Sequence, residues 1–299
     1  MSFNSPKTLL NRLGLRPKKT WGQHFLLHPH QARRIVAALQ LTGADTVVEI
    51  GAGLGALTGL LAPAARRVIA LERDPELARF LREELFAETP GVEVICQDAL
   101  EFDFPGAARE VGRPLAVVGN LPYQITSPLL FTLIRDIPAV AQAVLMMQQE
   151  VGTRLSASPG TKDYGILSVL VRYYFRITRL FSLSPGNFFP PPQVDSAVLR
   201  LLPETPDPAA LDAAMLHQVV KTAFGHRRKT LNNNLVAQAA TLGLTLEQMG
   251  DLLANLGIDP QRRGETLSLA EFVAISNQVS LLREGMRIAG AGRSPSIPL

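Results

Sequence analysis

The sequence has a single cysteine, Cys96, among its 299 residues. One cysteine cannot form an internal disulfide framework or a multi-cysteine zinc site, and it agrees with a reducing compartment. No apolar run approaches the roughly 18 residues of a membrane span. The first ten residues also lack the charged head, long apolar stretch and cleavage site of a signal peptide. We therefore expect a cytoplasmic protein without a membrane segment.

The signatures of several enzyme classes are missing too. There is no P-loop, no G-x-S-x-G and no H-E-x-x-H, so nothing favours nucleotide hydrolysis or the corresponding hydrolases. His24, His28 and His30 lie near one another, but no carboxylate or thiol accompanies them, and we expect no metal site. Cys96 is predicted to be a buried strand residue without a partner base.

Acidic residues are absent from the first 44 positions, which hold seven basic side chains. This arm carries +7, whereas residues 45–206 carry −4 and residues 207–299 carry +1. A second basic run, His226–Lys229, lies on a predicted helix. Each feature alone is compatible with a solvated surface. Taken together they favour contact with the phosphates of a polyanion.

What is present between Thr46 and Leu145 is an alternation of short β-rich runs with amphipathic stretches. This pattern is typical of a parallel sheet covered by helices on both faces. Strands are expected at Thr46–Ile50, Arg67–Glu72, Val92–Gln97, Leu115–Gly119 and Ala143–Met147. Helices are expected at Leu54–Leu61 and Pro75–Phe86, the second with Asp74 as its N-cap. The sequence thus predicts an α/β fold with a Rossmann-like domain over residues 1–206.

The second half has a different composition. Two segments, Val169–Ile177 and Ser196–Leu202, are predicted to be paired strands around the irregular, proline-rich segment 185–193. The three prolines between Leu202 and Ala209 indicate a linker. Helices are then expected at Leu211–Phe224, at Leu246–Leu256 and after a capping box formed by Ser268 and Glu271. A small helical domain over residues 207–299 follows, with a disordered tail after Ala289.

A glycine-rich segment, Glu49-Ile50-Gly51-Ala52-Gly53-Leu54-Gly55, joins the first expected strand to a helix. Glycines allow a tight turn there and a close approach of the main chain to a ligand. Gly51, Gly53 and Ala56 also fit the dinucleotide fingerprint, with Glu72 placed 21 residues after Gly51. In either case Glu72, at the end of the second strand, is expected to accept hydrogen bonds from two ribose hydroxyls. The segment alone does not decide between a nicotinamide cofactor and another nucleoside.

A tetrapeptide at the end of the fourth strand, Asn120-Leu121-Pro122-Tyr123, favours chemistry on an amino group attached to a flat ring. The lone pair of adenine's exocyclic amine is delocalised into the ring, so two hydrogen-bond acceptors on its hydrogens would make the nitrogen more reactive. Asn120 offers its side-chain carbonyl and the neighbouring main chain a second one, with Pro122 restricting that main chain. Tyr123 is placed to stack on a base that has been flipped out.

Together with two further segments, these motifs resemble the ribosomal RNA adenine dimethyltransferases. The further segments are Trp21-Gly22-Gln23-His24-Phe25-Leu26 and Phe189-Pro190-Pro191-Pro192-Gln193-Val194-Asp195-Ser196. The resemblance is strongest to members that dimethylate two adjacent adenosines near the 3′ end of small-subunit ribosomal RNA. It runs from about Lys18 to Asn277 and includes Ala223–Leu231 in the helical part.

The resemblance implies S-adenosylmethionine as the methyl donor and assigns roles to individual residues. Its donor-binding residues would be His24, Leu26, Gly51, Glu72, Asp98 and Asn120. Its catalytic and target-binding residues would be Asn120, Leu121, Pro122, Tyr123 and Phe188, with Tyr123 and Phe188 on either side of the target base. Arg227, Arg228 and Lys229 would bind RNA. The family usually has asparagine where this chain has His24.

The expected enzyme is therefore a monomeric rRNA adenine-N6,N6-dimethyltransferase that meets its RNA within a pre-assembled small ribosomal subunit. Two alternatives remain at this point. One is a large-subunit rRNA adenine dimethylase, which shares the Asn120–Tyr123 pattern. The other is a ribosome-assembly or nucleic-acid-binding factor whose methyltransferase pocket is incidental.

Overall fold

The computed structural model describes residues 5–291, apart from the side chains of Lys19 and of residues 287–291. Contacts divide the chain into two compact units, one of Met1–Ser156 with Tyr174–Glu204 and one of Ala157–Tyr173 with Thr205–Leu299. The predicted division after residue 206 differs from this one in residues 157–173 and 205–206, which belong with the helical unit. Within the described residues, no helix combines the length and apolar character needed to cross a membrane.

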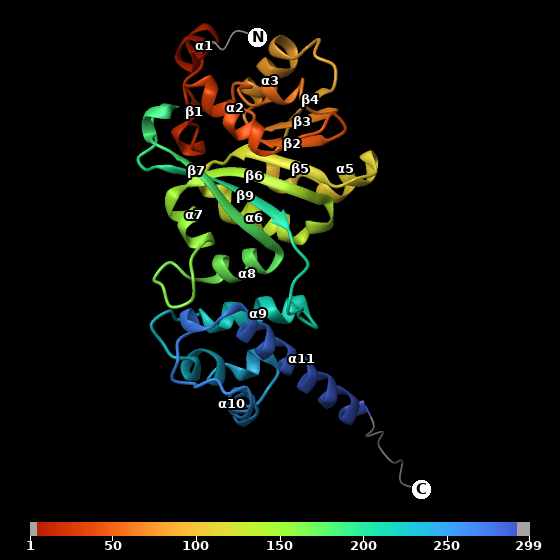
Figure 1. The fold of residues 1–299 in the computed structure, drawn as a ribbon, viewed down its shortest axis with the longest axis vertical. Helices are drawn as coiled ribbons and strands as arrows, with labels where there is room; N and C mark the ends of the chain where they lie inside the picture. The colour runs from red at the N-terminus through yellow and green to blue at the C-terminus, as the bar shows by residue number, and fades with distance from the viewer. Residues whose placement is uncertain (1–4, 292–299) are drawn as a thin grey trace. The chain divides into compact units, whose positions relative to one another are not determined.

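The first unit is built on a seven-stranded sheet (Figure 1). Its strands are β2 (Thr46–Ile50), β3 (Arg67–Glu72), β4 (Val92–Cys96), β5 (Leu115–Asn120), β6 (Val140–Gln148), β7 (Phe175–Leu183) and β9 (Ser196–Pro203). Their order is β4-β3-β2-β5-β6-β9-β7, with parallel pairing from β4 to β6 and antiparallel pairing for β9 and β7. The five predicted parallel strands are confirmed. This is the expected Rossmann-like α/β arrangement.

Helices and a second, two-stranded sheet complete this unit. The helices are α1 (Pro6–Arg12), α2 (Pro29–Ala38), α3 (Thr58–Leu61), α4 (Pro75–Phe80), α5 (Phe104–Val111), α6 (Thr126–Arg135) and α7 (Gln149–Leu155). The small sheet pairs β1 (Phe25–Leu26) with β8 (Phe188–Phe189). The predicted N-cap is confirmed, since the Asp74 side chain accepts from the Glu76 amide and Pro75 opens α4. The two expected helices are shorter than predicted, because residues 54–57 form turns and Leu81–Leu85 continue α4 as a π-helix.

The core of this unit lies on both faces of the sheet. All five residues of β2 are buried, as expected for a central strand covered on both sides. One apolar cluster joins Ile35 of α2 and Leu39, which caps the end of α2, to Val118 of β5. A second joins Leu77 and Phe80 of α4 to Ala70 of β3 and neighbouring residues. The sheet is therefore fixed from both sides, and its carboxyl edge is left to carry a site.

Two local predictions in this part of the sequence are wrong. The segment 169–174 is helical, in α8 (Ile166–Tyr174), and the strand begins only at Phe175. A continuous apolar run is compatible with a buried helix as well as a strand, and here Val169, Leu170 and Val171 are buried helical residues. Cys96 is in β4 as expected but is exposed, because β4 is an edge strand with a neighbour on one side alone.

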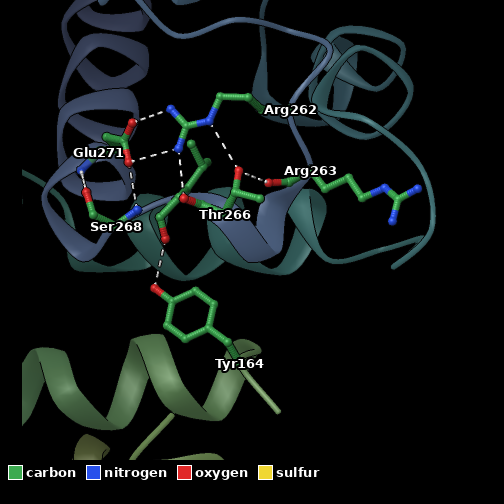
Figure 2. Close-up of polar contacts among 7 residues, drawn as sticks. Tyr164, Arg262, Arg263, Thr266, Ser268 and Glu271 are labelled. Carbon is green, nitrogen blue, oxygen red and sulfur yellow. Dashed lines mark hydrogen bonds and ion pairs between the residues drawn. The ribbon is translucent and has the colours of Figure 1, made fainter. Parts of the chain in front are cut away.

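The second unit is helical. Besides α8 it contains α9 (Ala213–Ala223), α10 (Leu246–Asn255) and α11 (Leu269–Ala291), with shorter helical turns η7 (Asn232–Val236), η8 (Ala239–Leu242) and η9 (Gly264–Thr266). The predicted capping box is confirmed: the Glu271 amide donates to Ser268 Oγ at 3.2 Å and the Ser268 amide to Glu271 Oε2 at 2.7 Å (Figure 2). The predicted disordered tail falls mainly on residues 292–299, which lie outside the described residues.

The basic run His226–Lys229 is not helical, contrary to the prediction. It belongs to a turn that follows α9. The helix α9 ends at Ala223, and the side-chain amide of Asn234 donates to the Ala223 carbonyl at this helix end. The cations are therefore presented by a loop and not by one face of a helix.

Candidate active site

A cavity of about 310 Å³ opens at the carboxyl ends of the parallel strands. This edge is where ligands bind in open α/β sheets, and the volume lies in the range of small-molecule sites. The cavity is lined by all six residues predicted to hold the donor: His24, Leu26, Gly51, Glu72, Asp98 and Asn120. Because four of them follow or end β2, β3, β4 and β5, the parallel register brings them together.

Glu72 is the best-placed carboxylate for a ribose. It ends β3 and is 6% exposed. Its Oε2 accepts from the Gly53 amide and its Oε1 from the Asp74 amide, both at 2.8 Å. Burial raises the pKa of Glu72, and these main-chain bonds oppose that shift. Each oxygen keeps a second lone pair, so the fixed carboxylate can accept from two vicinal hydroxyls.

The glycine loop between β2 and α3 leaves its main chain open to a ligand. Gly51 and Gly53 have φ angles of +69° and +57°, a region that strongly favours glycine. A Cβ on Gly53 would lie 3.2 Å from the Phe25 ring, which is tighter than an ordinary contact. Glycine is therefore required at these positions, and the loop can approach the amino-acid portion of a donor closely.

Asp98 lies across the cavity from this loop, after β4. Its Oδ1 accepts from the Leu100 amide at 3.0 Å and so caps a short helical turn, Ala99–Glu101. Its Oδ2 lies 3.5 Å from the Arg73 guanidinium. The carboxylate is oriented before any ligand arrives, which suits an acceptor for a cofactor's adenine amine.

Glu49, the first residue of the glycine-rich segment, is a buried acid to which the sequence pattern assigns no role of its own. It is 1% exposed, lines the cavity and accepts from Thr58 Oγ1 at 2.6 Å. Burial raises the pKa of Glu49 to about 8. Its carboxyl is therefore mainly protonated at neutral pH in the absence of a ligand. The signal available in the sequence was an acid inside an otherwise apolar strand.

Residues 18–26 form a strap along one wall of the cavity. Lys18 Nζ and Gln23 Nε2 both contact the carboxylate of Asp74, at 2.8 and 2.9 Å. Burial alone would raise the pKa of Asp74, but the hydrogen bonds from Lys18 and Gln23 outweigh it and lower the pKa. Since the Asp74 amide also donates to Glu72, the strap is linked to the Glu72 carboxylate through one residue.

The same strap reaches the reaction side of the cavity. Asn120, at the end of β5, donates from Nδ2 to the main-chain carbonyl of His24 at 2.7 Å. Among residues 5–291 no donor is recorded for Asn120 Oδ1, so the amide presents an acceptor. His24 in turn donates from Nδ1 to the carbonyl of Pro190, also at 2.7 Å. The residue that departs from the family pattern therefore joins the strap to the proline-rich motif.

The remaining predicted residues do not all line the cavity. Leu121 is buried, and its amide donates to the carbonyl of Met146. Pro122 lines the cavity and fixes the start of the turn Tyr123–Ile125. The Tyr123 hydroxyl is hydrogen-bonded to Ser196, and burial raises its pKa. Phe188 is 2% exposed and packs in the core beside β1. Its place as one face of a base sandwich stays a prediction.

Some of the cationic side chains form ion pairs within the chain. In the N-terminal arm, Arg12 pairs with Glu84 and Lys18 with Asp74, so part of the +7 is neutralised within the chain. In the helical unit Arg227, Arg228 and Lys229 are exposed, and Arg227 Nε also lies 3.2 Å from Glu265 Oε2. Within the described residues there is no cluster of side chains that could hold a metal ion.

Comparison with known proteins finds a matching family and similar proteins. The family model described as ribosomal RNA adenine dimethylase matches residues 14–276. A protein of Geobacter metallireducens named ribosomal RNA small subunit methyltransferase A is 45% identical over 271 residues, covering 90% of this chain and 98% of its own. A protein of the same name from Myxococcus xanthus is 44% identical over 282 residues, covering 94% and 97%.

Solved structures agree. A dimethyladenosine transferase from Plasmodium falciparum is similar with a TM-score of 0.72 and 27% identity, covering 88% of this chain and 98% of that one. The 23S rRNA methyltransferase ErmE is similar with a TM-score of 0.63 and 26% identity, covering 86% and 99%. The family model over residues 14–276 and a relative 45% identical over 90% of the chain show that this chain belongs to the ribosomal RNA adenine dimethylase family.

Proposed function

We propose that this protein transfers methyl groups to the exocyclic amines of two adjacent adenosines in the 3′-terminal hairpin of small-subunit ribosomal RNA. The donor is S-adenosylmethionine. The observation that carries the proposal is the hydrogen bond from Asn120 Nδ2 to His24, which leaves Oδ1 as the acceptor at the cavity wall. An acceptor held in this way suits an amine as the group that attacks.

The residues of the cavity fit the donor. Glu72 offers two oriented oxygens for a ribose, Asp98 an acceptor for an adenine amine, and Gly51 an open main chain for the amino-acid portion. When bound, S-adenosylmethionine supplies an electrophilic methyl group on its sulfonium. The work of the chain is then to orient the two reactants and to exclude water.

On the target side, two acceptors would hold the amine. Asn120 Oδ1 is one. The carbonyl of Leu121 is the better second acceptor, because that of Pro122 already accepts from the Ile125 amide. Hydrogen bonds to both amine hydrogens draw electron density toward the nitrogen and favour its pyramidal form. No strong base is needed, since the nitrogen becomes acidic once its lone pair has formed the new bond. Its proton can pass to water or to an acceptor.

The substrate is supported by the relatives and by charge. Both quoted relatives are named for the small subunit and are far more similar to this chain than ErmE, named for 23S rRNA. This favours the small-subunit reading over the large-subunit alternative. Arg227, Arg228 and Lys229 are exposed cations suited to phosphates on the RNA. We infer a cytoplasmic enzyme that acts as a monomer on a pre-assembled small subunit.

The test is methylation of purified small subunits that lack the modification. Mass spectrometry of the digested RNA should find dimethyladenosine confined to the 3′-terminal hairpin. Modification of large-subunit RNA with that hairpin untouched would contradict the proposal. Failure to transfer to any RNA, with particle binding retained, would favour an assembly factor with an incidental pocket.

Charge reversal at Arg227 and Arg228 tests the RNA contact separately. Each phosphate contact contributes roughly 0.7 to 0.9 to the slope of log affinity against log salt concentration. The double variant should therefore bind the particle more weakly and with a flatter salt dependence. Its affinity for S-adenosylmethionine should stay that of the parent, because the donor cavity lies in the other unit.

A further inference from the structure

Asn234 is a buried polar residue whose side chain is bonded almost wholly to one loop. We call that loop, residues 224–230, the basic turn; it contains Arg227, Arg228 and Lys229. Asn234 lies in η7, just after the turn, and is 1% exposed. Its Nδ2 donates to the carbonyls of Ala223 at 2.9 Å and His226 at 3.1 Å, and its Oδ1 accepts from the His226 amide at 3.2 Å.

These side-chain bonds hold the basic turn in one conformation, which its own main-chain hydrogen bonds are too few to do. Within the turn the main chain closes one bond of its own among the described residues, from the Lys229 amide to the His226 carbonyl at 2.9 Å. A loop with so few internal bonds is expected to sample several shapes in isolation. One amide side chain that bonds both the amide and the carbonyl of His226 fixes the middle of the loop. The carbonyl of Lys229, at 3.5 Å from Nδ2, places its far end within reach as well.

A second support holds the opposite side of the turn. A Cβ on Gly264 would lie 2.6 Å from the carbonyl oxygen of Ala223, so the segment 262–267 approaches the start of the turn as closely as glycine allows. Thr230 and Arg263 form a β-bridge at its end, and the Leu231 amide donates to the carbonyl of Arg262 at 2.7 Å.

That support is itself fixed. Figure 2 shows the Arg262 guanidinium between Glu271 and Thr266, with bonds of 2.5 Å to Glu271 Oε1 and 2.8 Å to the Thr266 carbonyl. Below it, the Tyr164 hydroxyl donates to the carbonyl of Leu267 at 2.9 Å. These contacts fix the 262–267 segment, which lies against the start and the end of the basic turn, while Asn234 bonds the middle of the turn.

We propose that Asn234 is a positioning residue for RNA binding: it holds the basic turn in one shape, so that Arg227, Arg228 and Lys229 meet their phosphates together. The inference rests on the proposed function, because it requires that these cations bind RNA. Ordering a loop during association costs binding free energy, and a loop ordered in advance avoids that cost. A loosened turn would keep its three charges and still neutralise fewer phosphates at once.

The test compares Asn234→Ser with Asn232→Ser. Serine is neutral and too short to bond the turn from position 234. Asn232 is exposed, and its side chain forms no hydrogen bond within residues 5–291, so its variant is the matched control. Binding to unmodified small subunits is measured at several salt concentrations. For Asn234→Ser we expect about tenfold weaker binding and a slope reduced by about one. Asn232→Ser should behave as the parent.

Three further measurements separate positioning from general loss of structure. Affinity for S-adenosylmethionine and far-ultraviolet circular dichroism should be unchanged for Asn234→Ser, and hydrogen exchange should rise at the His226 amide. Gly264→Ala keeps the Asn234 side chain but displaces the Ala223 carbonyl, one of its acceptors, from the other side of the turn, and should flatten the same slope. A lowered melting temperature with the parental slope would mean that Asn234 only stabilises the unit, and would overturn the inference.

A variant with Arg227, Arg228 and Lys229 all changed to Gln separates RNA binding by the basic turn from the positioning role of Asn234. If its binding and slope equal those of the parent, the basic turn does not bind RNA and the RNA contact within the proposed function fails. If the triple variant loses slope while Asn234→Ser keeps it, the RNA contact stands and the positioning role of Asn234 is wrong.

Discussion

The two halves of the cavity differ in how far they are formed in the free protein. In the donor half, Gly51, Glu72 and Asp98 line the cavity, and the two carboxylates are already oriented by main-chain amides. In the target half, Phe188 lies in the core and Tyr123 is tied to Ser196. The donor half thus has its acceptors in place, whereas in the target half the Phe188 ring is buried and the Tyr123 ring is only partly exposed. We therefore expect the donor to bind without RNA, and the base to require a rearrangement around Tyr123 and Phe188.

Asn120 lies where the two halves meet, and its loss should have the largest effect. Asn120→Ala removes an acceptor that is used most strongly as the amine becomes a nucleophile, and removing one such positioned group typically costs about a hundredfold or more in turnover. Single-turnover transfer from labelled donor measures this loss. Titration calorimetry should find the affinity for the donor far less affected.

One outcome for Asn120→Ala would contradict the assignment of Asn120 to the target half. If donor affinity fell as much as turnover, Asn120 would act mainly as a donor-binding residue. The hydrogen bond to His24 would then matter for shaping the donor half and not for presenting an acceptor to the amine.

Glu72→Ala should break the donor half alone. It removes two charge-assisted hydrogen bonds to the ribose, each worth roughly 1.5 to 3 kcal/mol, so donor affinity should fall at least about tenfold. Glu88→Ala is the matched control, because Glu88 is exposed and outside the cavity. Titration calorimetry with S-adenosylmethionine measures both. Unchanged affinity for Glu72→Ala would remove the ribose assignment.

Tyr123 tests the target half. Tyr123→Ala should weaken the binding of the target base by about 1 to 3 kcal/mol through lost stacking, and so slow methyl transfer to RNA. The affinity for the donor should not change. Tyr123→Phe keeps the ring and loses the bond to Ser196, so it should retain most activity. If the Phe variant behaved like the Ala variant, the hydroxyl and its bond to Ser196 would be the important feature, and stacking would be the wrong explanation.

Part of the donor half was predictable because the strand pattern gives its position. Once β2, β3, β4 and β5 are recognised, the parallel register brings their carboxyl ends, and with them Glu72, Asp98 and Asn120, to one edge of the sheet. The roles of these residues toward a donor came from the family resemblance, as did the inclusion of His24 and Leu26. The capping residues Asp74 and Ser268 were predictable for a similar reason, since a cap acts over three residues of local sequence.

Features that depend on contacts distant in sequence were missed. The apolar segment 169–174 is a buried helix, which its apolar run alone could not distinguish from a strand. At the end of α9, Asn234 donates to the carbonyl of Ala223, eleven residues earlier, and the basic turn follows. The hydrogen bonds from Lys18 and Gln23 to Asp74 join residues more than fifty positions apart, and no local sequence pattern predicts them. Burial of Phe188 likewise depends on β8 pairing with β1.

The smallest effect expected concerns Glu49, beneath the donor half. Its folded-state pKa of about 8 lies above that of a carboxyl in an unfolded chain, so the folded protein binds the proton more tightly. The resulting stability is present in full at low pH and is lost as pH rises through 8. Between pH 7 and 8 the free energy of unfolding should fall by about 1 kcal/mol relative to Glu49→Gln, whose amide does not titrate. Urea unfolding of both proteins without ligand, at each pH, measures this difference. A difference that stayed constant across this range would mean that Glu49 is ionised in its buried site and that the donor half holds a carboxylate at neutral pH even when free.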